Sequence, residues 1–436
     1  MKDKIRSSLK YSFIDGSFVS VMLAFGDTFI GPYAIALKAT NFQIGLLSSL
    51  PGLVTSLFQI KVPDWTDQAG RKRMMNIWVF AQAFMWLVIL AIPYMFGFKN
   101  AVPFLIAAVI LYSVFGSFSG PAWASIMTQY LPKDKRGRYF SWRYKLHGLI
   151  TLVMTFAAGY ILYRFPRESI AGFTVIFSVA LVCRFVSWYY ITKMHEPPIQ
   201  LKPGSYFSFK DFLSRARHSN FAKFVFFVGA ISMAVNMSAP FFSVYMLREL
   251  KLDYMTFTIV NTSAALAMLL SFQRWGHYTD KLGCVRVISL TSLFVPVIPV
   301  LWLFSHSLWY LICIQLLSGF VWAGFNLAIS NFIFDAVSEE KRVRCLSYFA
   351  LINGLGIFFG AALGGAVISH LPMIYGSSLL TMFLISGILR LLIRLLFIPH
   401  IKEVKPVECC SNLELFNRAT GMKPIIGVIQ GVLKNE

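Results

Sequence analysis

The sequence predicts an all-α polytopic membrane protein in which twelve transmembrane helices form two pseudo-symmetric six-helix bundles. Of its 436 residues, 57% are hydrophobic and 14% are charged, whereas soluble domains are usually about 45–50% apolar and about 25% charged. The chain also runs repeatedly for roughly 20 residues with few charges, the length that crosses a hydrocarbon core about 30 Å thick. An internal repeat, described below, divides the helices into two halves.

Hydropathy, together with the Pro, Gly and charged residues at the boundaries, places the twelve helices. The expected ranges are 11–37, 41–60, 74–97, 101–130, 144–163, 168–193, 221–247, 254–273, 287–305, 308–335, 347–368 and 372–398. The expected domains are an N-terminal six-helix half (1–193), a cytoplasmic linker (194–220), a C-terminal six-helix half (221–398) and a cytoplasmic tail (399–436).

The distribution of basic residues orients the predicted bundle, because short loops rich in Lys and Arg stay in the cytoplasm. One set of alternate loops carries only six of the 40 Lys and Arg residues, namely Lys38, Lys99, Arg164, Arg167, Arg248 and Lys251. Both termini are therefore expected in the cytoplasm, with the protein in the plasma membrane, which is the inner membrane of a Gram-negative cell. The net charge of +21 follows from this topology, so no nucleic-acid partner is expected, and contact with anionic membrane lipids is a secondary expectation.

The chain shows no sign of a cofactor, a metal site or an enzymatic function. Its six cysteines have no zinc-type spacing, and H-E-x-x-H, G-x-S-x-G and phosphate-binding Gly-Lys patterns do not occur. The basic N-terminus lacks a small-residue cleavage site, so it is expected to lead into a retained first helix.

Four pairs of segments repeat at offsets of 206 to 213 residues. They are "DQAG" (67–70) with "DKLG" (280–283), "LPKDKRGRYFS" (131–141) with "VSEEKRVRCLS" (337–347), "GPYAIAL" (31–37) with "APFFSVY" (239–245), and Arg184 with Arg390. A spacing kept across four places indicates two homologous halves in parallel orientation.

The first "DQAG" segment and its surroundings resemble the loop signature of the major facilitator superfamily of secondary transporters, a fold of two parallel six-helix halves. The matching positions are Asp67, Gly70, Arg71 and Lys72, with Gly276, Asp280 and Gly283 in the second copy. The chain departs from the signature at Pro63 and lacks an Arg directly after Gly283. The resemblance implies that Asp67 and Arg71 form a latch that closes the cytoplasmic side during alternating access. A solvated loop that only signals topology is the alternative.

Asp27 is the most informative charged residue within a predicted span, because charges are costly in the membrane and mark functional sites. It lies near mid-span in "FGDTFIGPY", and Val235 occupies the equivalent position in the second half. We interpret Asp27 as a proton or cation site, or as a partner for a basic substrate group; a structural Asp is the alternative. Arg184 and Arg390, near helix ends, are expected to snorkel, and Asp15 to snorkel or cap.

The resemblance places the substrate cavity between helices one, four, seven and ten. The candidate substrate and coupling residues on these helices are Asp27, Thr28, Ser119, Trp123, Asn236, Gln315, Asn326 and Asn331. Polar groups among aromatic residues suit a small organic or amphipathic solute. Hydrogen bonds between helices are the competing explanation for these side chains.

We therefore expect a monomeric secondary active transporter, with a small solute, membrane lipids and a proton or other cation as its partners. Proton coupling through Asp27 is favoured, and uniport stays open. A lipid or lysolipid transporter, or a non-transporting sensor on the same scaffold, is the alternative. Helix five lacks the Gly-Pro pattern typical of drug/proton antiporters, which weighs against drug efflux, and the sequence does not distinguish import from export.

Overall fold

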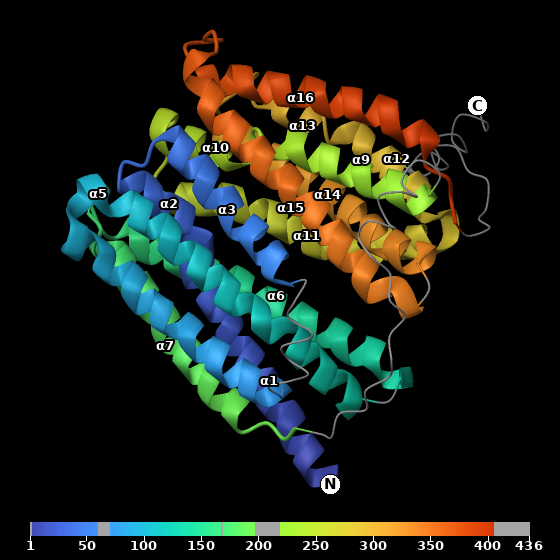
Figure 1. Ribbon diagram of the computed structural model, residues 1–436. Coiled ribbons are helices and arrows are strands. Elements are labelled where there is room, and N and C mark those ends of the chain that lie inside the picture. Colours follow the sequence, from blue (N-terminus) through green and yellow to red (C-terminus); the bar gives the residue numbers. More distant parts are fainter. Residues whose placement is uncertain are drawn as a thin grey trace, which may run out of the picture. The chain divides into compact units, whose positions relative to one another are not determined.

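The computed structural model describes residues 2–59, 70–131, 133–166, 169–196, 219–337 and 339–404. These ranges are almost entirely helical, and the strand-like feature within them is one isolated bridge between Ile374 and Ser377. The predicted all-α membrane fold is confirmed (Figure 1).

The described helices follow one another along the chain. The first part contains α1 (Lys2–Met22), η1 (Leu23–Asp27), α2 (Thr28–Ala36), α3 (Asn41–Gln59), α5 (Arg71–Tyr130), α6 (Lys133–Tyr163) and α7 (Ala171–Thr192). The second part contains α9 (Asn220–Asn236), α10 (Ala239–Val244), η2 (Tyr245–Glu249), α11 (Tyr254–Leu282), α12 (Cys284–Phe294), α13 (Val297–Leu301), α14 (Leu308–Ala336), α15 (Glu339–Val367), η3 (Ile368–His370), α16 (Ser378–Phe397) and η4 (Ile398–His400).

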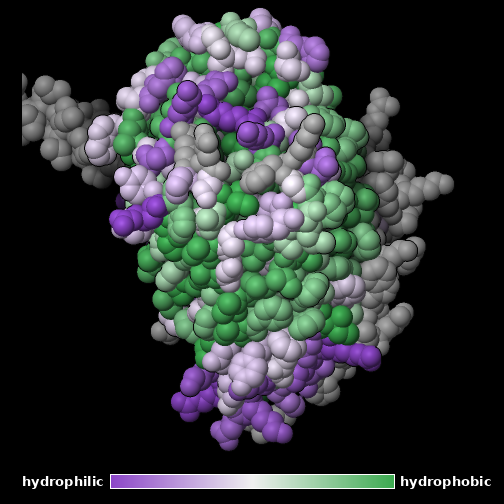
Figure 2. Space-filling view, turned by 90° about the vertical axis from the view of Figure 1, so that its left-hand side faces the viewer, coloured by the Kyte–Doolittle hydropathy of each residue, from purple (hydrophilic) through white to green (hydrophobic). Residues whose placement is uncertain are grey.

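Within the described ranges, eleven helices are long and apolar enough to cross a membrane. The twelfth expected helix is α3, which has 19 residues but carries polar side chains at both ends. Helices three and four of the prediction are the spans Arg71–Gly97 and Asn100–Met127. They share the label α5 and are separated by a break at Gly97, where φ is 65° and ψ is 165°. On the face shown in Figure 2, a band of hydrophobic residues separates two hydrophilic ends, as expected for a surface that meets lipid.

The chain folds into two compact units. Unit 1 comprises Met1–Pro203, Val235–Thr262 and Ala350–Met382, and unit 2 comprises Gly204–Ala234, Ser263–Phe349 and Phe383–Glu436. Segments of the predicted second half therefore pack with the first half inside unit 1. The division into halves at residues 193 and 221 remains a prediction from the repeat.

In unit 1, α1 and α5 both pack against α7, and α3 packs against α5 (Figure 1). Small residues allow close approach: a Cβ built on Gly26 would lie 2.3 Å from the ring of Trp86. In unit 2, α12 packs against α14, and a Cβ on Gly319 of α14 would lie 2.0 Å from the carbonyl oxygen of Ala264. Such small residues let helices pack closely in a membrane.

The repeated "D-x-x-G" segments end in the same backbone geometry. Gly70 has φ 84° and ψ 138°, and Gly283 has φ 94° and ψ 157°. Each directly precedes a helix, α5 and α12. Only glycine adopts such a positive φ without strain, which explains why the sequence repeats this residue.

Arg184 and Arg390 do not snorkel, so that expectation was wrong. Their side chains are buried, with 5% and 2% exposure. Arg184 donates to Gln82 and Ser187, and Arg390 donates to the Ser386 hydroxyl and the Val295 carbonyl. A membrane-buried guanidinium is held by acceptors inside its own bundle, which compensates part of its desolvation.

Replacing Gly70 or Gly283 with alanine is expected to lower stability by about 1–3 kcal/mol, because a side chain at this φ strains the backbone. The measurement is the melting temperature of the purified protein in detergent. Gly52→Ala is the matched control, because a Cβ at Gly52 in α3 meets no atom within 4 Å. Equal melting temperatures for Gly70→Ala and Gly52→Ala would contradict the assignment.

Candidate functional site

Asp27 stands at a break in the first transmembrane helix. The π-helical turn η1 ends at Asp27, and the Thr28 backbone N–H donates to the Leu23 carbonyl. The Thr28 hydroxyl donates to the same oxygen at 3.1 Å, and Pro32 lies inside the following α2. Single π-helical turns are often found at functional sites, and Asp27, which ends this one, is an exposed residue.

The exposed carboxylate of Asp27 lines a cavity of about 340 Å³ within unit 1. Aliphatic side chains from α2, α3 and α5, among them Ile30 and Leu47, form much of its wall, and α10 contributes Pro240 and Ser243. The volume and the mainly apolar lining with a few polar groups are those of a small-molecule site.

Tyr112 of α5 fixes the position of the Asp27 carboxylate. Its hydroxyl donates to Asp27 Oδ1 at 2.6 Å, and Trp86 packs edge-on against its ring with centroids 5.0 Å apart. Trp86 reaches this place because Gly26 has no side chain. A rigid aromatic pair therefore holds the charged group at the cavity wall.

A second polar network lies deeper in the same bundle. Asp15 Oδ1 accepts a hydrogen bond from Ser187 at 2.7 Å, and Ser187 Oγ accepts one from Arg184 at 3.1 Å. Asp15 is only 5% exposed, so the expectation that it snorkels or caps was wrong. Arg184 also donates to Gln82 of α5. The network joins α1, α5 and α7, and a charged group buried without such partners would be unstable.

Two further basic side chains pack against α1 from α6. Arg143 Nη2 donates to the Ser12 carbonyl at 3.1 Å, and a ring nitrogen of His147 lies 3.3 Å from the Phe13 carbonyl. Both side chains occupy the space left by Gly16, where a Cβ would come within 2.3 Å of each.

Of the eight candidate substrate and coupling residues, Asp27 alone lines the cavity. Three others donate to protein groups. Thr28 bonds as above and Ser119 bonds to the Gly116 carbonyl at 2.8 Å, both within their own helix, whereas the Trp123 indole donates to Ser12 of α1 at 2.9 Å. The remaining candidates are Asn236 at the end of α9, and Gln315, Asn326 and Asn331 on α14 in unit 2.

The predicted latch is described only in part, because Asp67 lies outside the described residues. Arg71 is 3% exposed and binds within unit 1. Its backbone N–H and Nε lie 3.0 Å and 3.5 Å from Glu196 Oε1, and Nη1 donates to Ser125 at 3.1 Å. In the second copy, Gly283 precedes α12 and Asp280 is exposed near the end of α11.

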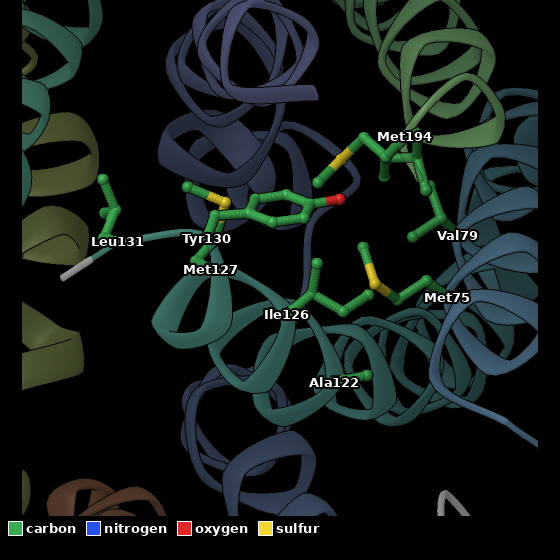
Figure 3. Packing of buried hydrophobic residues seen from close by; sticks show 9 residues of the cluster. Met75, Val79, Ala122, Ile126, Met127, Tyr130, Leu131 and Met194 are labelled. Atoms are coloured by element: carbon green, nitrogen blue, oxygen red, sulfur yellow. The ribbon is translucent and has the colours of Figure 1, made fainter. Parts of the chain in front are cut away.

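The helix ends near Arg71 are packed together by a cluster of nine buried hydrophobic residues (Figure 3). Met75 and Val79 come from the start of α5, Met127 and Tyr130 from its end, and Met194 from the segment after α7. The Tyr130 hydroxyl donates to the His195 carbonyl. This cluster holds Glu196 beside Arg71.

Residues of the two predicted halves touch directly at the other end of unit 1. Arg248 in η2 donates to Asn41 Oδ1 at 3.2 Å and to the Ala39 carbonyl. Nearby, a Cβ on Gly45 of α3 would lie 2.4 Å from the Ala361 carbonyl oxygen of α15. These interactions hold α2, α3 and α10 around the Asp27 cavity.

Several residues of the site are missing from the sequence prediction. Tyr112 and Gln82 sit in apolar runs with no signal that separates them from other membrane residues. Glu196 follows helix six in "HEPP". A single carboxylate among the basic residues of the predicted cytoplasmic side could have been recognised as a partner for a basic residue such as Arg71. Arg248 was counted only as a loop cation.

The family model of the Major Facilitator Superfamily matches residues 16–239 and 224–408, and this chain belongs to that family. It is a multi-pass membrane transporter and not an enzyme. A curated relative is the "Multi-drug resistance efflux pump PmrA homolog" of Lactococcus lactis subsp. lactis (strain IL1403), 24% identical over 379 residues, which cover 84% of this chain and 89% of the relative.

Solved transporter structures share the fold at low sequence identity. A crystal structure of the nucleoside transporter NupG matches with a TM-score of 0.70 and 15% identity, covering 90% of this chain and 100% of that one. A bacterial homologue of the iron transporter ferroportin in an inward-facing state matches with a TM-score of 0.68 and 13% identity, covering 91% and 98%.

Arg248→Ala is expected to loosen the contact with Ala39 and Asn41 and to open the Asp27 cavity at that end. The measurement is the rate at which a water-soluble maleimide labels Ser243→Cys in the purified protein, in a background in which the native cysteines are replaced. The labelling rate should rise several-fold. Arg248→Lys keeps the charge but not the forked donor geometry, so its effect should be intermediate. A rate unchanged by Arg248→Ala would show that this contact does not close that end of the cavity.

Proposed function

We propose that this member of the major facilitator superfamily is a secondary active transporter of a small organic or amphipathic solute, driven by protons that bind Asp27. The observation that carries the proposal is the exposed Asp27 carboxylate in a mainly apolar cavity of about 340 Å³. A carboxylate in such a cavity binds either a proton or the basic group of a solute. Because the two compete for the same carboxylate, movement of one across the membrane is coupled to movement of the other.

The character of the cavity supports the solute class. Its wall combines aliphatic side chains with the carboxylate of Asp27, the phenol of Tyr112 and serine hydroxyls. An amphipathic molecule with a basic or hydrogen-bonding group fits this lining better than a highly charged one. The efflux-pump name of the curated relative supports export of such compounds. The absence of the antiporter Gly-Pro pattern from helix five is the observation that weighs against it.

The proposed orientation places both termini in the cytoplasm, as the basic loops predict. In that orientation Arg71 lies at the cytoplasmic end and Arg248 at the opposite end. The latch belongs to this proposal: Arg71, bound to Glu196 in this structure, exchanges partners with Asp67 or with the second half when the cytoplasmic side closes.

Asp27→Asn is expected to abolish solute accumulation driven by a pH gradient while preserving exchange of solute across the membrane. The measurement uses proteoliposomes with ethidium as an amphipathic cation and uridine as an uncharged solute. Asp27→Glu, which keeps the titratable group, should retain coupling. Accumulation that persists unaltered in Asp27→Asn, with its pH dependence intact, would overturn the coupling role. Movement of labelled lysophospholipid in place of both solutes would favour the lipid-transporter alternative.

Gly31→Val is expected to slow transport by filling the cavity without destabilising the protein. Gly31 lines the cavity, and a Cβ there meets no atom within 4 Å. Transport rates and melting temperatures are compared with those of Gly52→Ala, which also introduces a side chain into open space. Unchanged transport by Gly31→Val at normal stability would show that the solute passes elsewhere.

A further inference from the structure

A set of four buried or cavity-facing charged residues in unit 1 has charges that cancel when all are ionised. The acids are Asp15 and Asp27 on the first helix, and the bases are Arg143 on α6 and Arg184 on α7. Other titratable groups that face this set are His147, Tyr139 and Tyr144 of α6 and Tyr112 of α5. Removing one member would leave a net charge in a low-dielectric interior, which is expensive.

A continuous path of contacts connects the two acids through Arg184. From Asp15 it runs by Ser187 to Arg184 and on to Gln82. Gln82 packs against Gly116, where a Cβ would lie 2.4 Å from Gln82 Nε2. One turn earlier on the same helix is Tyr112, which donates to Asp27.

Arg184 is the charged group common to both acids. Its positive charge acts on Asp15 and on Asp27, while Asp15 also interacts with Arg143. Neutral hydrogen bonds alone would only hold the helices together. Because both acids interact with the same cation, the charge on one acid changes the proton affinity of the other.

We propose that Asp15 and Arg184 form a buried ion pair, bridged by Ser187, that sets the proton affinity of Asp27. Asp15 is a positioning residue in this arrangement and does not contact the cavity. Its negative charge offsets that of Arg184, so that Asp27 can accept a proton during the transport cycle. This inference rests on the proposed role of Asp27 as the proton site.

The second half offers an internal comparison. Arg390 is the repeat counterpart of Arg184 and is equally buried, yet Lys223 and Val235 stand at the positions equivalent to Asp15 and Asp27. Arg390 donates to Ser386 and to the Val295 carbonyl. The two acids of the network are therefore specific to the first half, whereas the buried arginine is common to both.

The test follows the carboxyl carbonyl band of protonated Asp27 by infrared difference spectroscopy of the full-length protein as pH is varied. The Asp27 band is the one that disappears in Asp27→Asn, so no solute needs to be known. Asp15→Asn should shift its titration midpoint to lower pH by about half a pH unit or more, because Arg184 then acts on Asp27 without an offsetting charge. Arg184→Gln should shift the midpoint to higher pH.

Two variants guard against effects of misfolding. The double variant Asp15→Asn, Arg184→Gln removes the pair together, leaves no unpaired member of it, and should titrate closer to wild type than either single variant. Arg390→Gln removes the equivalent buried arginine and should leave the midpoint unchanged. Shifts of the same sign in Asp15→Asn and Arg184→Gln, or no shift in either, would overturn the inference while leaving Asp27 as the proton site. Absence of any Asp27-dependent band would instead overturn the proposed function.

Discussion

Burial of charge inside an apolar helix bundle is the constraint on which the first half of this protein depends. A guanidinium or carboxylate removed from water is tolerated only with acceptors, donors and an opposite charge around it. Here the partners of Asp15 and Arg184 come from α1, α5 and α7, and Arg143 approaches from α6. The polar groups consequently specify which helices meet and how closely. Glycines where these helices meet remove the side chains that would otherwise keep the polar groups apart.

The sequence was sufficient for the properties that depend on local composition. Hydropathy located the helices, and the repeat anticipated the matching geometry of Gly70 and Gly283. The cost of a mid-membrane charge singled out Asp27, which lines the cavity; its role in coupling stays a prediction. The sequence failed where the outcome depends on distant partners. Asp15 was assigned to the surface by its depth, but its acceptor oxygen bonds to Ser187, 172 positions away. Thr28 and Ser119 looked like ligands, but their hydroxyls bond to backbone carbonyls within their own helix.

The two repeats have the same structural glycine and buried arginine, but they differ in their acidic residues. The glycine before the third helix of each half and the buried arginine in the last helix occur in both. Arg184 donates to Gln82, and Arg390 donates to the carbonyl of Val295, which is the repeat equivalent of Gln82. The repeat therefore accounts for the shared framework. The carboxylates at positions 15 and 27 have no acidic counterparts in the second half, so the proposed proton site belongs to the first half.

The π-helical turn η1 also sets the angular register of the first helix. Asp15 and Asp27 are twelve positions apart, which in an uninterrupted α-helix of 3.6 residues per turn would place them about 120° apart around the axis. A π-helical turn absorbs about one extra residue. The two acids then behave as if about eleven positions apart and share nearly one face. The wide turn thus acts as a one-residue insertion that turns the second acid onto the helix face of the first.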